Sequence, residues 1–161
     1  MTVDELFRNR ERLFWMLNVA GWTGYTLAAW LGALAHEKPE SYFAVILATA
    51  AAGFVFTIPM RYLYRRLWQR SPITLAAGMI LTSYLVAFAW KPLQNVWYWD
   101  WVKDGWRPDE LMGYVGGVLG SFYILLCWSG LYFGIRYYQQ LQEQTEATLK
   151  ATSAAHQAQL K

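Results

Sequence analysis

Long stretches without a charged side chain constrain this sequence more than any other feature. Four windows contain no Asp, Glu, Lys or Arg, at residues 13–35, 41–60, 71–90 and 111–135. A helix needs about 20 apolar residues to cross the ~30 Å hydrocarbon core of a bilayer. Four such windows in a chain of 161 residues predict an all-α membrane protein with four transmembrane helices.

Lys and Arg side chains indicate the orientation, because they are enriched in the cytoplasmic loops of membrane proteins. Ten of the 14 lie before the first window, between the second and third, or after the fourth. The other four, at the opposite ends of the helices, are Lys38, Lys91, Lys103 and Arg107. Both termini are therefore expected on the cytoplasmic side.

The windows divide the chain into three parts. Residues 1–12 are expected to form an amphipathic segment on the cytoplasmic membrane surface, beginning with a capping box between Thr2 and Glu5. Residues 13–135 contain the four-helix membrane domain. Residues 136–161 are polar and rich in Gln, with no Pro or Gly. The fourth membrane helix is therefore expected to continue into the cytoplasm without a break.

Aromatic residues crowd the segment "KPLQNVWYWDWVKDGWRPDE", which we expect to form a loop on the outer side. Trp prefers the headgroup region of a bilayer, so an aromatic belt in contact with membrane lipids is one interpretation. A ligand-sensing site is the other, because aromatic faces beside carboxylates can hold a cation. Its residues would be Trp97, Trp99, Asp100, Trp101, Asp104 and Trp106.

Small residues recur at four-residue spacing where the fourth window begins. The sequence "GYVGGVLGS" gives two overlapping GxxxG pairs, Gly113/Gly117 and Gly116/Gly120. Rows of this kind let two helix backbones approach closely in a membrane. They predict either close packing inside the four-helix bundle or the interface of a homodimer.

The sequence contains no arrangement of side chains that is typical of catalysis. It has no phosphate-binding loop, nucleophile elbow or nucleic-acid-binding motif. With only two His residues and one Cys, neither a metal site nor a bound cofactor is expected. Proton-coupled transporters usually place an ionisable group within the membrane, and the four windows contain no charged residue. Transport is therefore disfavoured.

Several segments together resemble the membrane half of LytS/AlgZ-type sensor histidine kinases. They are "LNVAGWTGY", the Arg-rich link between the second and third windows, "CWSGLYFGIRYYQQLQEQ" and the tail "ATSAAHQAQLK". In that family an A-x-L-K-x-L-x-x-Q-L segment leads into an N-P-H-F-x-F-N box that holds the phosphoacceptor His. The tail matches the start of this lead-in at residues 158–161. His156 lacks the preceding Asn-Pro and the following Phe, so the phosphoacceptor role is not carried over to it.

The resemblance implies a sensor domain of a two-component system in the bacterial inner (cytoplasmic) membrane. The kinase region would follow residue 161, so this chain is not expected to be an enzyme by itself. The parent protein would autophosphorylate and pass the phosphoryl group to a LytTR-type response regulator. Signal transmission would use residues of the tail, namely Arg136, Tyr138 and Leu149. The alternatives are a small four-helix transporter subunit and a membrane adaptor that recruits a cytoplasmic partner.

Overall fold

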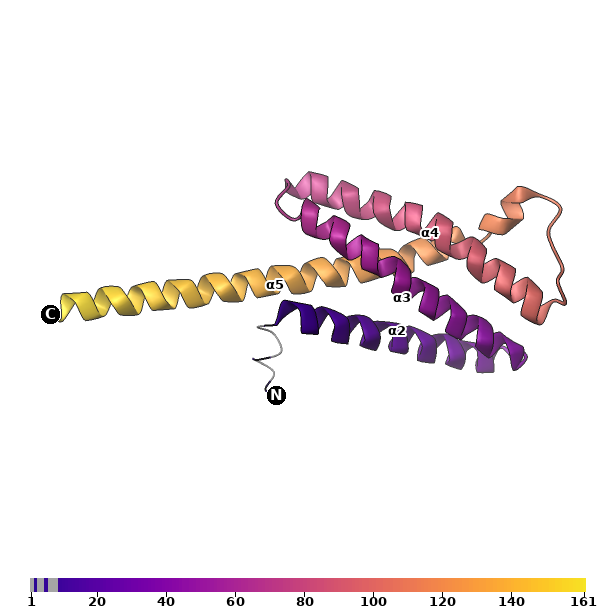
Figure 1. Ribbon diagram of the computed structural model, residues 1–161, viewed down its shortest axis with the longest axis horizontal. Helices are drawn as coiled ribbons and strands as arrows, with labels where there is room; N and C mark the ends of the chain where they lie inside the picture. Colours follow the sequence, from indigo (N-terminus) through magenta and orange to yellow (C-terminus); the bar gives the residue numbers. More distant parts are fainter. Residues whose placement is uncertain (1, 3–4, 6–8) are drawn as a thin grey trace. The chain divides into compact units, whose positions relative to one another are not determined.

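The computed structural model describes Thr2, Glu5 and residues 9–161, and from residue 9 onward it is helical apart from short connections. The elements are α2 (Arg10–Ala35), α3 (Ser41–Leu67), α4 (Pro72–Val102), the 3₁₀ helix η1 (Leu111–Val115) and α5 (Val118–Gln159) (Figure 1). The prediction of an all-α fold is confirmed for this part of the chain. The chain divides into two compact units, Met1–Cys127 and Trp128–Lys161, and the division falls within α5.

The capping box at the start of the chain is present. The backbone N–H of Thr2 donates to Glu5 Oε2 at 3.1 Å, and the N–H of Glu5 donates to Thr2 Oγ1 at 3.3 Å. The predicted amphipathic segment at residues 1–12 includes residues 1, 3–4 and 6–8, which lie outside the described residues. Whether that segment lies on the membrane surface stays a prediction.

Side-chain caps and short connections define the first three long helices. Asn9 caps α2 by accepting a hydrogen bond from the N–H of Arg12 at 3.3 Å. Ser71 caps α4 in the same way. Pro72 follows at the first helical position, where a backbone N–H would have no partner within the helix, so that its absence costs no hydrogen bond. Helix α3 packs against both α2 and α4. The connections at residues 36–40 and 68–71 are too short for anything but antiparallel neighbours.

The core of the first unit is built from aromatic rings, one of which packs directly on a glycine. Trp22 of α2 and Trp90 of α4 are both buried and meet edge to face, with ring centroids 5.4 Å apart. The Trp22 ring lies directly on Gly53 of α3, where any Cβ atom would overlap it. The indole N–H of Trp90 donates to the backbone carbonyl of Thr49 in α3, at 2.9 Å. These contacts fix the packing of three helices around one point.

Polar contacts also join α2 to α3. The buried hydroxyl of Thr57 lies 3.3 Å from Asn18 Oδ1 and 2.7 Å from the Phe54 carbonyl oxygen, and its one proton can be donated to either. One helical turn away, the buried guanidinium of Arg61 lies over the Phe14 ring, 4.0 Å from its centroid, and its Nη1 lies 4.0 Å from Glu11 Oε1. The guanidinium thus has an aromatic face and a carboxylate beside it, as a buried cation requires.

Within the described residues, three helical stretches are long and apolar enough to cross a membrane: Ser41–Leu67, Pro72–Val102 and Leu111–Gln159. Helix α2 has 26 residues but is not among them. Its window was recognised by its lack of charge, yet it contains Asn18 and several Thr, Gly and Trp residues, which lower its hydropathy. The four-span count therefore stays a prediction, whereas three possible spans are observed.

The structure corrects the predicted loop between the third and fourth windows. Helix α4 does not end at residue 90 but continues to Val102, so most of the aromatic segment is helical. The window was closed at Lys91, but a single Lys does not end a helix. Its ammonium group donates to Gln94 Oε1 at 2.8 Å, one turn along the same helix. Pro92 also lies inside α4 without terminating it.

The predicted start of the fourth helix is also corrected. Gly113 belongs to η1, and Gly116 and Gly117 form the turn between η1 and α5. Gly117 has a φ of 78°, which glycine adopts at no steric cost. The pairs Gly113/Gly117 and Gly116/Gly120 therefore do not form rows on an α-helix. These glycines make a bend in the backbone, and only Gly120 lies within α5.

Helix α5 extends from the apolar part of the sequence through its polar tail. It contains 42 residues, Val118–Gln159. At 1.5 Å per residue it is about 63 Å long, roughly twice the thickness of a hydrocarbon core. The predicted continuation of the fourth helix past residue 135 is confirmed.

Candidate functional site

The last turns of α4, the connection that follows and η1 form one locally ordered region at the end of the first unit. Asn95 connects them: its Nδ2 donates to the backbone carbonyls of Tyr114, at 2.8 Å, and Gly116, at 3.2 Å. One carboxamide thus holds η1 and the turn before α5 against α4. The structure of this region depends on a side chain that the sequence analysis did not single out.

Trp99 is the centre of the aromatic cluster in this region. It is 7% exposed, and its ring meets those of Trp106 and Tyr114 edge to face, with centroids 5.9 and 5.0 Å apart. Trp97 and Trp101 instead stack on each other, 6.1 Å apart, one helical turn along α4. The predicted ligand-sensing residues therefore fall into two groups. Residues two apart on a helix point in nearly opposite directions, so one site cannot contain them all.

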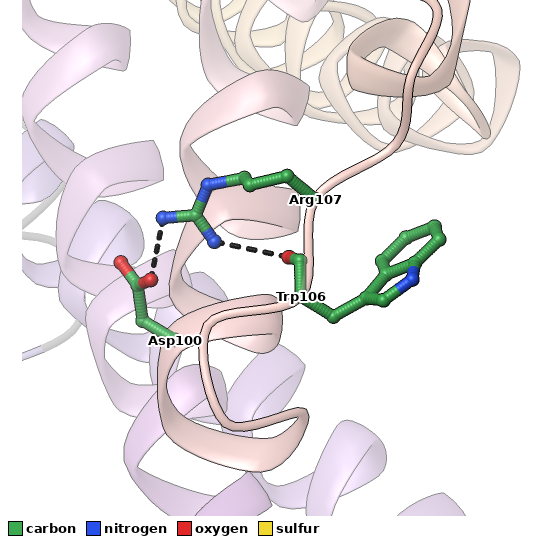
Figure 2. Close-up of polar contacts among 3 residues, drawn as sticks. All are labelled: Asp100, Trp106 and Arg107. Carbon is green, nitrogen blue, oxygen red and sulfur yellow. Dashed lines mark hydrogen bonds and ion pairs between the residues drawn. The ribbon is translucent and has the colours of Figure 1, made fainter.

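The carboxylate of Asp100 pairs with a cation of the chain itself. Arg107 Nη2 contacts Asp100 Oδ1, and Arg107 Nη1 donates to the carbonyl of Trp106 at 3.1 Å (Figure 2). The guanidinium also lies 5.9 Å from the Trp99 ring centroid. Figure 2 shows the Trp106 ring pointing away from this pair. The acid and the aromatic face that were expected to hold an external cation therefore hold Arg107.

Asp104 lies apart from this pair, in the turn that ends α4. Asp104 and Gly105 have positive φ values of 51° and 80°. Asp tolerates the left-handed conformation better than most residues, and Gly adopts it freely. The backbone conformation of Asp104 is therefore explained by the turn.

A cavity of about 210 Å³ adjoins α4, and of its lining residues the sequence analysis used only Lys38 and Lys91, to assign orientation. Helix α4 contributes Lys91, Gln94, Asn95 and Tyr98, which share one face at the spacing i, i+3, i+4, i+7. Lys38 comes from the connection between α2 and α3, and Tyr42 and Val45 come from the first turns of α3. The helical spacing would have revealed this face in the sequence if residues 91–98 had not been taken for a loop.

The walls of this cavity are held together by aromatic contacts. Tyr42 and Tyr98 meet edge to face with ring centroids 5.7 Å apart, joining α3 to α4. The ammonium group of Lys38 lies 5.8 Å from the Tyr42 ring centroid. Lys91 lies close to Gly117, whose Cβ position would be 3.0 Å from Lys91 Cε. The cavity therefore adjoins the turn before α5.

The residues predicted to transmit a signal all lie on α5. Tyr138 and Leu149 are exposed, and Arg136 is half-buried. The Tyr138 hydroxyl accepts a hydrogen bond from Gln142 Nε2 at 3.0 Å, one turn further along. All residues from 141 to 160 are exposed. This part of α5 has a free surface on every side within its unit.

Metal-binding chemistry is not indicated among the described residues, which contain no group of three or more His, Cys, Asp or Glu side chains that could hold an ion. No protein-family model, curated protein or solved structure matches this chain.

Proposed function

We propose that this chain is the membrane-embedded sensing and transmitting domain of a LytS/AlgZ-type sensor histidine kinase in the bacterial inner membrane. The observation that supports this most strongly is the continuity of α5. One helix of 42 residues connects the bend at Gly117 with a fully exposed polar tail. A helix about 63 Å long spans a ~30 Å core and still extends well beyond it. Such a helix can carry a displacement out of the membrane.

The proposed domain has four spans with both termini in the cytoplasm, and α2 is the span that needs most support. Its 26 residues correspond to about 39 Å of helix, enough to cross the core. Its buried Asn18 is bonded to Thr57 of α3, and its Trp22 fills the space at Gly53. A helix that places its polar groups against a partner helix can enter a bilayer despite a modest hydropathy.

The mechanism that we propose starts at the outer end of α4. A ligand that prefers one arrangement of η1 and the Gly116–Gly117 turn would bias the position of α5, since a ligand shifts an equilibrium only by its differential affinity for the two states. Asn95 bonds directly to this turn. The tail would then pass the shift to a kinase that autophosphorylates and phosphorylates a LytTR-type response regulator.

We also propose that the domain acts as a homodimer. Gly120, Gly130 and Gly134 of α5 have no atom within 4 Å of their Cβ positions among the described residues. Small residues with open space in front of them allow a second helix to approach closely in a membrane. The dimer is therefore proposed along α5 rather than at Gly113, Gly116 and Gly117.

The test of this function is the coding sequence that follows Lys161, together with the activity of its product. The proposal expects an N-P-H-F-x-F-N box within about two helical turns, a nucleotide-binding domain after it, and autophosphorylation of the full product in membranes. A stop codon directly after Lys161 would contradict the kinase assignment and favour the adaptor. Uptake or efflux by the chain alone in liposomes would favour the transporter.

A further inference from the structure

The cavity beside α4 has the chemistry of an anion-binding pocket. Two ammonium groups, from Lys38 and Lys91, line it together with the carboxamides of Gln94 and Asn95 and the rings of Tyr42 and Tyr98. None of its lining residues is a carboxylate, although Glu37 and Glu40 lie near Lys38 in the chain. Among the described residues, neither Lys38 nor Lys91 has an ion-pair partner. The two positive charges are thus available to a ligand.

The size and the donor set point to a phosphate group. A cavity needs roughly 10–15 Å³ of such space to hold one water, so about 210 Å³ is ample for a tetrahedral oxyanion and the atoms attached to it. Lys binds phosphate as a point charge, and two Lys match a group that carries up to two negative charges. The Gln94 carboxamide N–H groups and the phenol groups of Tyr42 and Tyr98 supply further hydrogen bonds to its oxygens. A phosphate group also offers more oxygen atoms to these donors than a carboxylate does.

The same residues contact the turn before α5. Asn95 donates to the Gly116 carbonyl at 3.2 Å while lining the cavity, and the Lys91 side chain packs against Gly117. A phosphate group bound to Lys91 would hold that side chain in place against Gly117, while Asn95 keeps its bond to the Gly116 carbonyl. The cavity is therefore connected by two side chains to the Gly116–Gly117 turn, which directly precedes α5.

We propose that the cavity between the α2–α3 connection, the start of α3 and α4 binds a phosphate group through Lys38, Lys91 and Gln94, and that its occupancy orders the Gly116–Gly117 turn. The binding site stands on its own residues, whereas the effect on α5 rests on the sensor function proposed above. The phosphate belongs either to a free solute or to the headgroup of an anionic lipid at the outer membrane surface.

The first experiment measures binding by the full chain in nanodiscs. Inorganic phosphate is titrated by calorimetry into nanodiscs of neutral phosphatidylcholine, and thermal unfolding is compared between phosphatidylcholine and phosphatidylglycerol nanodiscs. Saturable binding of phosphate identifies a solute site, and stabilisation by phosphatidylglycerol alone identifies a headgroup site. If neither probe has an effect, the proposal is overturned.

The charges are tested with Lys38→Gln combined with Lys91→Gln. The double variant should weaken phosphate binding, or reduce the lipid-specific stabilisation, by about tenfold or more, because two charge-assisted contacts are lost. Lys103→Gln removes one exposed charge at the end of α4, outside the cavity, and should bind as the wild type does. Equal binding by all variants overturns the site. If the double variant does not fold, the same measurement is made on the single variant Lys38→Gln, which changes an exposed residue.

The effect on α5 is tested by hydrogen–deuterium exchange with and without the probe that binds. Exchange should slow at residues 113–118 and stay unchanged at residues 141–159, which are exposed throughout. Unchanged exchange at 113–118 would overturn the ordering of the turn. A stimulus response of the full kinase that persists in the double variant would overturn the pocket as its sensor and leave the sensor function standing.

Discussion

The bundle of α2, α3 and α4 and the polar tail of α5 are both helical, but they are stabilised in different ways. In the bundle, Trp22, Gly53 and Trp90 bring three helices together, and the indole N–H of Trp90 bonds across to α3. In the tail, residues 141–160 are all exposed. The hydroxyls of its Thr residues bond back to carbonyls four residues earlier, as Thr145 does to Leu141 at 2.9 Å.

This difference indicates where the molecule can change its conformation. A packed interior resists displacement because each side chain fills a defined space. A solvated helix depends on intrinsic propensity and local bonds, which leave it marginally stable. The bundle is therefore the part suited to hold a binding site, and the tail is the part whose structure a partner or a small displacement can alter.

Trp90→Ala is the change expected to damage the bundle most. It removes a buried ring, the edge-to-face contact with Trp22 and the bond to the Thr49 carbonyl, and such truncations destabilise by about 3–5 kcal/mol. Equilibrium unfolding in mixed detergent micelles measures the loss. Trp101→Ala, at a residue that is 45% exposed and stacked only on Trp97, should cost about 1 kcal/mol. Equal losses would show that the core is misassigned.

Leu149→Pro should break the tail and spare the bundle. Proline removes a backbone N–H and clashes with the preceding turn, which destabilises a helix interior by about 3 kcal/mol. Exchange of the amides near residue 149 should accelerate, while the unfolding midpoint of the bundle stays at its wild-type value. Leu149→Ala, which keeps the helix, is the matched control. A lower midpoint in the proline variant would mean that the two regions unfold together.

Gly53→Ala tests the contact between α2 and α3 with a single methyl group. The new Cβ would overlap the Trp22 ring, and overpacking of this kind destabilises by about 1–3 kcal/mol. Gly24→Ala in α2 is the control, because nothing lies within 4 Å of its Cβ position. That control should be neutral or stabilising by up to about 1 kcal/mol, owing to the higher helix propensity of Ala. The two variants should thus differ in sign.

Thr57→Val should have the smallest effect. It keeps the shape of the side chain and removes the contacts of its hydroxyl with Asn18 Oδ1 at 3.3 Å and with the Phe54 carbonyl at 2.7 Å. Interhelical hydrogen bonds in membrane proteins contribute about 0.6 kcal/mol on average. A double-mutant cycle with Asn18→Ala measures this coupling directly. A coupling energy of zero would mean that the pair does not hold α2 against α3.

Features that repeat along a helix could be predicted from the sequence. The charge-free window at 13–35 ends at the last residue of α2, and the window at 41–60 begins at the first residue of α3. These boundaries agree because a connection between membrane helices collects charged and turn-forming residues. The continuation of α5 could also be predicted, since no Pro or Gly interrupts residues 135–161. The capping box of Thr2 and Glu5 could be predicted as well, because its two residues have a fixed local spacing.

Features that depend on contacts between distant residues could not be predicted. Periodicity does not reveal that Trp22 lies on Gly53, or that Asn95 bonds to a turn 21 residues later. The charge criterion ended the third helix at Lys91, and this error concealed the polar face of α4 that lines the cavity. The acids at 100 and 104 were grouped as a ligand site because carboxylates beside aromatic faces can hold a cation, and the sequence alone does not show that Arg107 pairs with Asp100.

The transmission of a displacement through α5 is tested most directly by insertions after Gln142 in the full protein. Two alanines rotate the rest of the helix by about 200°, whereas four rotate it by about 400° and restore nearly the original face. Autophosphorylation in membranes is then measured for both variants and the wild type. A transmitter predicts that two residues change the rate several-fold and that four leave it close to the wild-type rate. Equal rates in all three proteins would show that the tail only tethers the kinase, and would contradict the account.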